Sequence, residues 1–306
     1  MDMKKFFTAI FFSILLMSLL LISACSKKTA FLQTEEIRLV SLSPSITETV
    51  FALGAGSLLC GRTDFCNYPE EAKSVESVGG FDGKTLSVEK IIALKPKLVL
   101  GVSAMHDFMK AQLESYGIDL YLSRINSIED VYAEVLYVGK VCECEDKAEN
   151  LVEKMKEKIQ AVKEYTQKNS TVKKVYWEVD SSPYISVGNK SYIHEMISIA
   201  TGGQNIFYDL DTEFPVVSEE TILARNPDVI IMPVYTIEEM TELDSSQNSR
   251  VEKFQRKNWQ NLSAVKNNRV YNIFSDYISR TGPRLLYGIE IIAHYVSGYE
   301  CTFDEE

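Results

Sequence analysis

Apolar and polar residues follow two kinds of pattern in turn along most of the chain, one typical of strands and one typical of helices. The first alternating run begins at Ile37 (IRLVSLS), as expected of a half-buried strand. In the segment that follows, SPSITETVFALG, Ser43 stands in position to cap a helix, Pro44 at its first position and Gly54 at its end. Later runs such as LVLGV are continuously apolar, which is typical of strands buried on both faces. Strands that alternate with helices predict an α/β fold with a largely parallel sheet.

One combination of helix and strand occurs twice in the chain. The first copy reads SVEKIIALKPKLVL from Ser87, and the second reads SEETILARNPDVII from Ser218. In each copy a Ser precedes a short helix, a Pro ends the helix, and an apolar run predicts a strand. The repeat period, about 130 residues, is far too long for a solenoid. The repetition therefore predicts two similar α/β lobes.

A long amphipathic segment separates the two halves. Between residues 146 and 168 apolar side chains recur every three or four positions, and Lys and Glu fill the opposite face. A helix of this kind is roughly 33 Å long at 1.5 Å per residue. The domain boundaries that follow from these patterns are a signal peptide at 1–24, an anchor linker at 25–36, an N-terminal lobe at 37–145, a connecting helix at 146–168 and a C-terminal lobe at 169–306.

The N-terminal segment is typical of an exported protein. It begins with basic residues, carries no charge from Phe6 to Ala24, and ends in ISACSKK. A secretory signal has this order of basic start, apolar middle and small residues before the cleavage point, although a plain transmembrane anchor also suits an apolar stretch of this length. Small residues directly before Cys25 resemble a lipobox, in which the thiol is lipidated and the upstream peptide is removed. The sequence therefore predicts an exported protein whose Cys25 carries acyl chains that hold it at a membrane surface, either the cell membrane or facing the periplasm.

Charge and cysteine content narrow the possible partners. The net charge is −11 and no Lys/Arg-rich block occurs, which argues against a nucleic acid as partner. Excess negative charge suits docking on a basic protein surface. Of the five cysteines beyond the lipobox, Cys142 and Cys144 are too close for the usual zinc-ligand pair. We interpret the five as structural or incidental, and the sequence leaves any disulfide pairing open.

The sequence contains few of the motifs that carry catalysis. It has three scattered histidines and neither GxSxG, HExxH nor the full phosphate-binding pattern GxxxxGK[ST]. Acid–base catalysis by a pair of carboxylates remains possible, because Asp and Glu are abundant in the sequence. Met105 and His106 follow the apolar run LVLGV, where α/β folds bind ligands, so they are weak candidates for axial ligands of a haem iron. A loop histidine is more often only a loop residue, and we expect no catalytic residue, no resident cofactor and no metal site.

Several segments in the same order resemble the cobalamin/iron-chelate family of ABC-transporter substrate-binding proteins. In the N-terminal half these are IRLVSLSPSITETVFALGAG, GRTDFCNYPEEAK and VGGFDGKTLSVEKIIALKPKLVL; in the C-terminal half they are FPVVSEETILARNPDVII and RVYNIFSDYISRTGPRL. The resemblance covers the chain from about Ile37 to near the C-terminus. It implies two Rossmann-like lobes joined by a single long helix, with a ligand in the cleft between them.

The resemblance also implies roles for particular residues. Phe65, Phe81 and Phe214 match aromatic residues that pack against the corrinoid in vitamin B12-binding members, and Arg280 matches an Arg near the ligand. Phe stands where Trp is usual at two of the three aromatic positions, and Val102 replaces a further aromatic residue. Flat apolar faces suit a macrocycle or a large chelate. A single Phe would more often be a core residue, but turn-like flanks favour the cleft for all three.

Glu89 and Glu220 hold equivalent positions in the two copies of the repeat, each two residues after the capping Ser. In the B12-binding relatives the residues at these positions meet arginines on the permease, although a Glu in the first turn also suits the helix dipole. The sequence thus predicts a monomeric, lipid-anchored protein that delivers a corrinoid or ferric chelate to an ABC permease with its ATPase. Haem or a siderophore is the alternative ligand, and an exported enzyme or chelatase on a two-lobed fold is the rival class.

Overall fold

The computed structural model describes residues 37–235 and 256–302. The predicted signal peptide, anchor linker and lipidated Cys25 lie outside these ranges, as does the polar stretch 241–250. Within the described residues no helix combines the length and the apolar character needed to cross a membrane.

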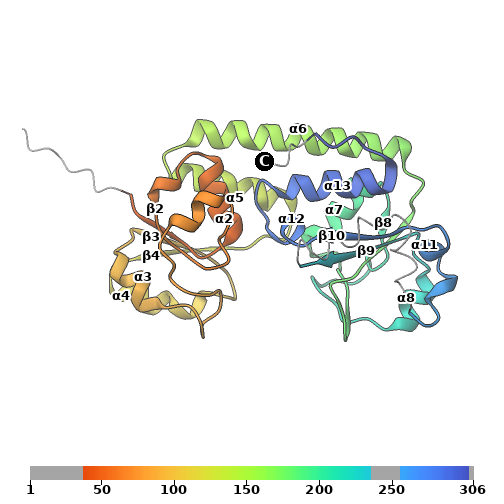
Figure 1. Cartoon of the computed structure of the whole chain (residues 1–306), viewed down its shortest axis with the longest axis horizontal. Coiled ribbons are helices and arrows are strands. Elements are labelled where there is room, and N and C mark those ends of the chain that lie inside the picture. The colour runs from red at the N-terminus through yellow and green to blue at the C-terminus, as the bar shows by residue number, and fades with distance from the viewer. Residues whose placement is uncertain (1–36, 236–255, 303–306) are drawn as a thin grey trace, which may run out of the picture. The chain divides into compact units, whose positions relative to one another are not determined.

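The N-terminal lobe, drawn in red to yellow in Figure 1, is built on a four-stranded sheet whose strand order is β2-β1-β3-β4. Its strands are β1 (Leu39–Ser41), β2 (Leu59–Arg62), β3 (Leu98–Val102) and β4 (Asp119–Ser123). Each neighbouring pair runs parallel. Leu39 and Val40 point to opposite faces and belong to different clusters of buried apolar side chains. The strands are therefore buried on both faces, as their apolar runs predicted.

The C-terminal lobe repeats this arrangement with the strand order β10-β9-β5-β8. The strands are β5 (Lys174–Trp177), β8 (Gln204–Asn205), β9 (Val229–Val234) and β10 (Val270–Phe274), all parallel to their neighbours. A short antiparallel hairpin, β6 (Asp180–Ser181) and β7 (Tyr184–Ile185), forms a separate two-stranded sheet.

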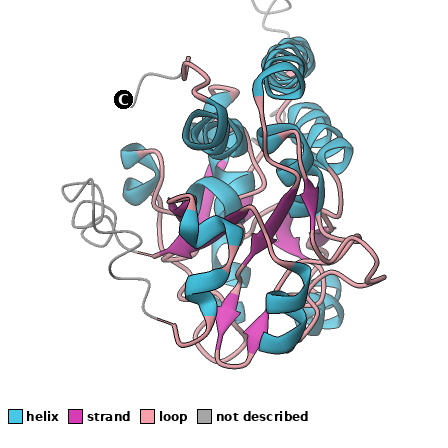
Figure 2. Ribbon diagram, turned by 90° about the vertical axis from the view of Figure 1, so that its right-hand side faces the viewer, coloured by secondary structure: helices cyan, strands magenta, loops and turns pink. Residues whose placement is uncertain are grey.

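Helices cover the faces of the sheets, as Figure 2 shows with helices in cyan and strands in magenta. In the N-terminal half these are α2 (Pro44–Ala52), α3 (Val88–Leu94), α4 (Lys110–Ser115) and α5 (Ile128–Val141). After them come α6 (Glu145–Asn169), α7 (Tyr192–Thr201), α8 (Glu219–Arg225), α11 (Ser263–Lys266), α12 (Asp276–Ser279) and α13 (Leu285–Ser297). Short 3-10 turns occupy Gly56–Leu58, Glu70–Ser74, Asp107–Met109 and Trp259–Asn261.

The long helix α6 joins the two lobes (Figure 1). It packs against α5 of the N-terminal lobe and against α7 and α13 of the C-terminal lobe. Its buried residues lie on one face, as the apolar spacing predicted: Ala148, Val152, Met155, Ile159, Val162 and Thr166. One continuous cluster of buried apolar side chains includes residues of both lobes and of α6. This two-lobed α/β architecture with a single connecting helix is the predicted fold class.

Candidate functional site

A cavity of about 510 Å³ lies between the two lobes. From the N-terminal lobe it is lined by Ser43, Pro44, Ser45, Phe65, Phe81, Val102, Ser103, Ala104, Ser123, Arg124, Ile125 and Asn126; from the C-terminal lobe it is lined by Tyr192, Glu213, Asp276, Ser279, Arg280 and Thr281. The N-terminal residues follow the carboxyl ends of the four parallel strands, where open α/β sheets bind their ligands. The volume falls within the range of about 300–1,000 Å³ that is usual for small-molecule sites.

Two of the predicted ligand-binding aromatics form one wall of the cavity. The Phe65 and Phe81 rings meet edge to face, with centroids 6.1 Å apart. Phe65 is 57 % exposed, which is unusual for a large apolar side chain and leaves its ring available to a ligand. Both residues follow β2 along the chain, on turn segments, as the flanks of each Phe predicted. Val102, the position at which the sequence lacks an aromatic residue, also lines the cavity.

His106 supports this wall from behind. Its ring is fully buried and meets the Phe81 ring at 5.3 Å between centroids. Its Nδ1 atom accepts a hydrogen bond from the Val102 amide (2.9 Å), so Nε2 carries the proton and donates to the Phe81 carbonyl (3.0 Å). Burial lowers the pKa of His106, which keeps the ring neutral at pH 7. Both ring nitrogens are thus occupied, which argues against His106 as an axial ligand of an iron.

Two other predicted residues do not line the cavity. Phe214 is 46 % exposed, and only the preceding residue, Glu213, contributes to the wall. Met105 is also exposed and follows Ala104, which does line the cavity. Ala104 has a φ of +63°, which is sparsely populated for a residue with a side chain and is typical of functional sites.

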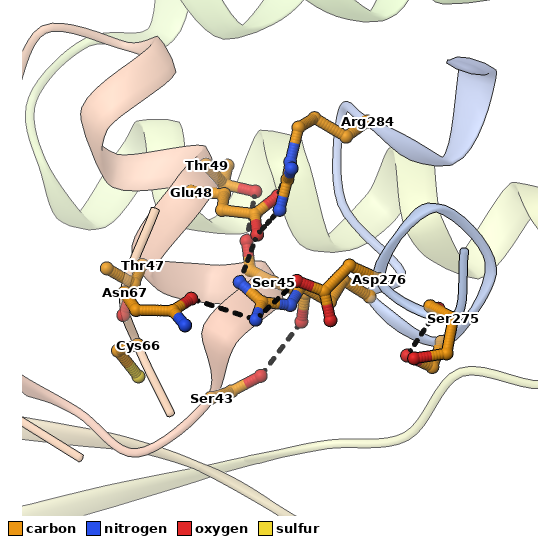
Figure 3. Close-up of polar contacts among 12 residues, drawn as sticks. Ser43, Ser45, Thr47, Glu48, Thr49, Cys66, Asn67, Ser275, Asp276 and Arg284 are labelled. Carbon is orange, nitrogen blue, oxygen red and sulfur yellow. Dashed lines mark hydrogen bonds and ion pairs between the residues drawn. The ribbon is translucent and has the colours of Figure 1, made fainter. Parts of the chain in front are cut away.

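Arg280 lies in the cavity wall, as the resemblance implied, but it is held by other protein groups. Its guanidinium pairs with Glu48 across the two lobes (3.0 Å) and with Asp276 in its own lobe (2.7 Å). It also donates to the Asn67 side chain at 2.9 Å. Figure 3 shows how these three partners of the Arg280 guanidinium, Glu48 and Asn67 from the N-terminal lobe and Asp276 from the C-terminal lobe, lie close together.

Arg284 completes this buried ion cluster. It makes two hydrogen bonds to the Glu48 carboxylate, Nε to Oε2 at 2.8 Å and Nη2 to Oε1 at 2.6 Å, and stacks over the Tyr68 ring at 3.7 Å. Glu48 is 3 % exposed, so its charge depends on the two arginines for compensation. The cluster therefore ties α2 of the N-terminal lobe to the segment around α12 of the C-terminal lobe, beside the cavity.

The repeated sequence forms the same local structure in both lobes. The side chain of Ser87 accepts from the Lys90 amide and that of Ser218 from the Thr221 amide, so each Ser caps a seven-residue helix, α3 or α8. Glu89 and Glu220 lie in the first turns and are exposed. The neighbouring Glu219 is engaged instead, because it accepts a hydrogen bond from the Trp259 indole at 2.6 Å. The two exposed carboxylates thus occupy equivalent places, and their role in docking stays a prediction.

The cysteines contribute no chemistry to the site. Within the described residues Cys60, Cys66, Cys142, Cys144 and Cys301 are all free thiols. Burial raises the pKa of Cys66 and raises that of Cys142 to about 12, which makes both thiols unreactive at neutral pH. The described part of the chain also contains no group of three or more side chains arranged to hold a metal ion.

Sequence reasoning missed several polar residues of the site. Glu48 and Arg284 lie inside motifs that carry the family resemblance, but nothing in their spacing shows that they meet. Ser103, Arg124 and Asn126 follow strands β3 and β4, so the end of a predicted strand was the available signal.

Comparison with known proteins identifies the family. The model of the periplasmic binding protein family matches residues 39–277. An uncharacterised ABC transporter substrate-binding lipoprotein of Bacillus subtilis, YvrC, is 34 % identical over 93 % of this chain and 87 % of the relative. The vitamin B12-binding protein of Vibrio parahaemolyticus is 28 % identical over 85 % of this chain and 90 % of the relative. A crystal structure from Staphylococcus epidermidis, described as a possible iron-binding periplasmic solute-binding protein, has a TM-score of 0.71 and 26 % identity over 85 % of this chain and 98 % of that chain.

The chain belongs to the periplasmic binding protein family. This confirms the predicted family and the two-lobed fold class. The relatives are named as binding proteins of transport systems and not as enzymes, which answers the rival class raised by the sequence. Membership implies an exported protein with a small-molecule ligand and an ABC permease as partners.

Proposed function

We propose that this protein captures a corrinoid or a ferric chelate in the cavity between its lobes and delivers it to an ABC importer. The observation that carries the proposal is the pair of Phe65 and Phe81 rings, the first of them exposed, in the wall of a cavity lined by both lobes. Aromatic side chains usually pack into the protein core, so an aromatic ring exposed in a concave site indicates binding of a ligand with a flat or apolar face.

The relatives support this class of ligand. The Vibrio parahaemolyticus relative is named for vitamin B12, and the Staphylococcus epidermidis structure is described as possibly iron-binding. Corrinoids, haem and many ferric chelates share a broad apolar surface around a coordinated metal. The protein itself supplies shape and hydrogen-bonding groups, and the metal arrives as part of the cargo. Haem and siderophores therefore belong to the same proposal as cobalamin.

We further propose that the protein acts as a monomer tethered by lipid on Cys25 and docks on the permease through Glu89 and Glu220, with an ATPase driving transport. The name of the Bacillus subtilis relative, a lipoprotein, supports the tether. The two exposed carboxylates, one on each lobe, suit a permease whose two like halves present the same basic feature twice.

The test is a ligand screen with the purified full-length protein in detergent. Cobalamin, cobinamide, haem, a ferric hydroxamate and a ferric catecholate are titrated by absorbance and by calorimetry. We expect one of these to bind, and Phe65→Ala and Phe81→Ala each to weaken that binding by about thirtyfold, because truncating a buried aromatic contact costs ~2 kcal/mol. Tyr116→Ala is the matched control, since Tyr116 is exposed outside the cavity.

Binding of none of these ligands would contradict the proposal. So would unchanged affinity in both folded Phe variants, because the ligand would then lie elsewhere.

A further inference from the structure

The charged residues that line the cavity differ in whether they are paired. Asp276 and Arg280 pair with each other, and Arg280 also pairs with Glu48. Arg124 and Glu213 line the cavity as well, both exposed, and within 37–235 and 256–302 neither side chain has a hydrogen bond or an ion pair. The cavity therefore offers a ligand one uncompensated positive charge, on the N-terminal lobe, and one uncompensated negative charge, on the C-terminal lobe.

The strand order places Arg124 at a defined edge of the cavity. Strands β3 and β4 are parallel neighbours, and Val102 pairs with Ser123 in their register. Ser103 and Arg124, the residues directly after these two, therefore lie side by side, and the Ser103 amide donates to the Ser123 carbonyl at 2.8 Å. Asn126, two residues after Arg124, also lines the cavity. The side chains of Ser103 and Asn126 make no hydrogen bond to any described residue, so both can donate to a ligand.

The opposite edge of the cavity is apolar. In the order β2-β1-β3-β4, strands β2 and β4 are the two edges of the sheet. Phe65 follows β2 within a few residues and Arg124 follows β4 directly. The wall formed by the N-terminal lobe thus changes across the sheet, from the exposed Phe65 ring at the β2 edge to a guanidinium with two hydrogen-bond donors at the β4 edge.

We propose that the cargo carries an anionic substituent, a carboxylate or a phosphate, which Arg124 binds together with Ser103 and Asn126. A guanidinium binds such oxygens through two parallel hydrogen bonds. A neutral ligand bound over Arg124 would displace water from the guanidinium without supplying a counter-charge, which costs binding free energy. Glu213 on the facing lobe repels an anion, so the substituent is oriented toward the β4 edge and the apolar face toward Phe65 and Phe81. This inference rests on the proposed function and adds a charge requirement to it.

The test compares anionic and neutral ligands on the full-length protein in detergent. Two pairs differ only by esterification: haem with haem dimethyl ester, and cobyrinic acid with its methyl ester. A third pair sets an anionic ferric catecholate against a neutral ferric hydroxamate. The variants are Arg124→Gln, which removes the charge, and Arg124→Lys, which keeps it. Lys140→Gln changes the net charge equally at an exposed position outside the cavity, and Glu213→Gln removes the opposing charge.

We expect the wild type to prefer the anionic member of the pair it recognises by about tenfold, the size of one charge-assisted hydrogen-bonding group. Arg124→Gln should lose this preference by weakening only the anionic ligand. Arg124→Lys should retain part of it, Lys140→Gln all of it, and Glu213→Gln should bind the anion at least as tightly as the wild type.

Equal affinity for both members of the recognised pair, or an equal loss for both in Arg124→Gln, would overturn the inference and leave the proposed function standing. Binding of none of the six probes would overturn the inference, and binding of neither these nor cobalamin and cobinamide would overturn the proposed function as well.

Discussion

At the scale of single residues, Glu134 on α5 is a buried carboxyl group of the N-terminal lobe for which the described part of the chain supplies neither an ion-pair partner nor a hydrogen-bond partner. Its side chain is 3 % exposed, and neither carboxylate oxygen has a hydrogen-bond partner among the described residues. Burial raises the pKa of Glu134 to about 7, and the nearby Ser123 hydroxyl opposes that shift. Because Ser123 also lines the cavity, this buried carboxyl lies directly behind the ligand-facing wall. Such a group weakens the fold whenever it is ionised.

This pKa predicts a particular dependence of stability on pH. Between about pH 4.5 and pH 7 the folded protein holds a proton on Glu134 that the unfolded chain has released, so stability falls as pH rises through this window and is level above it. The effect is about 3 kcal/mol, the product of the shift and 1.36 kcal/mol per unit. Glu134→Gln is neutral at every pH and should therefore remove this loss of stability. The stability of the variant minus that of the wild type should be larger at pH 8 than at pH 5.

Urea unfolding of wild type and variant at pH 5 and pH 8 measures the difference, and Glu153→Gln, on the exposed face of α6, is the control. A stability difference between Glu134→Gln and wild type that is the same at both pH values would show that the carboxyl is not protonated in the folded state.

At the scale of elements, the repeated unit of helix and strand has the same construction in both lobes. Each helix begins after a capping Ser and ends at a residue in the left-handed conformation, Lys95 at φ +49° and Asn226 at φ +44°, directly before a Pro. Each then leads into a buried strand, β3 or β9. The two exposed carboxylates of Glu89 and Glu220 are therefore presented on the same kind of scaffold, which is what a two-fold docking surface requires.

We expect Glu89→Arg and Glu220→Arg each to weaken docking on the permease by ~2–5 kcal/mol, because each leaves a desolvated arginine of the partner facing a like charge. Ligand affinity of the isolated protein should stay nearly unchanged, since neither residue lines the cavity. The double variant should abolish uptake at physiological salt. Glu153→Arg with Glu157→Arg, on the exposed face of α6, changes the net charge equally and should leave uptake intact. Normal uptake by the Glu89/Glu220 double variant would show that the repeat serves only the fold.

The elements themselves were largely predictable from the sequence, because their signals are local. The Ser caps, the Pro after each short helix and the apolar spacing of α6 all act within a few residues. The polar part of the cavity was not predictable, because it depends on which strands are neighbours. Arg124 and Ser103 meet only through the β3–β4 register. Likewise Glu48 and Arg284 are 236 positions apart and meet only when the lobes are assembled.

At the scale of the whole molecule, three kinds of contact join the two lobes within residues 37–235 and 256–302. One apolar cluster continues through α6 and both lobes. Glu48 pairs with Arg280 and Arg284 across the cleft. The Glu195 carboxylate on α7 also accepts from the Ile128 amide at 2.8 Å, at the first residue of α5. Relative rotation of the lobes would break all three kinds of contact, so large hinge motion is costly in this molecule.

We therefore predict that ligand binding closes the lobes only slightly. Small-angle scattering profiles of the full-length protein in detergent, with and without saturating ligand, should show no large rotation of one lobe against the other. Glu48→Gln separates the contributions: it leaves Arg280 and Arg284 without their shared counter-charge and should destabilise the fold by about 3–5 kcal/mol. Because α6 and its apolar contacts remain, the folded variant should scatter like the wild type. A rotation seen only in Glu48→Gln would assign the rigidity to the ion cluster, and a rotation seen on ligand binding in the wild type would show that α6 bends as a flexible hinge.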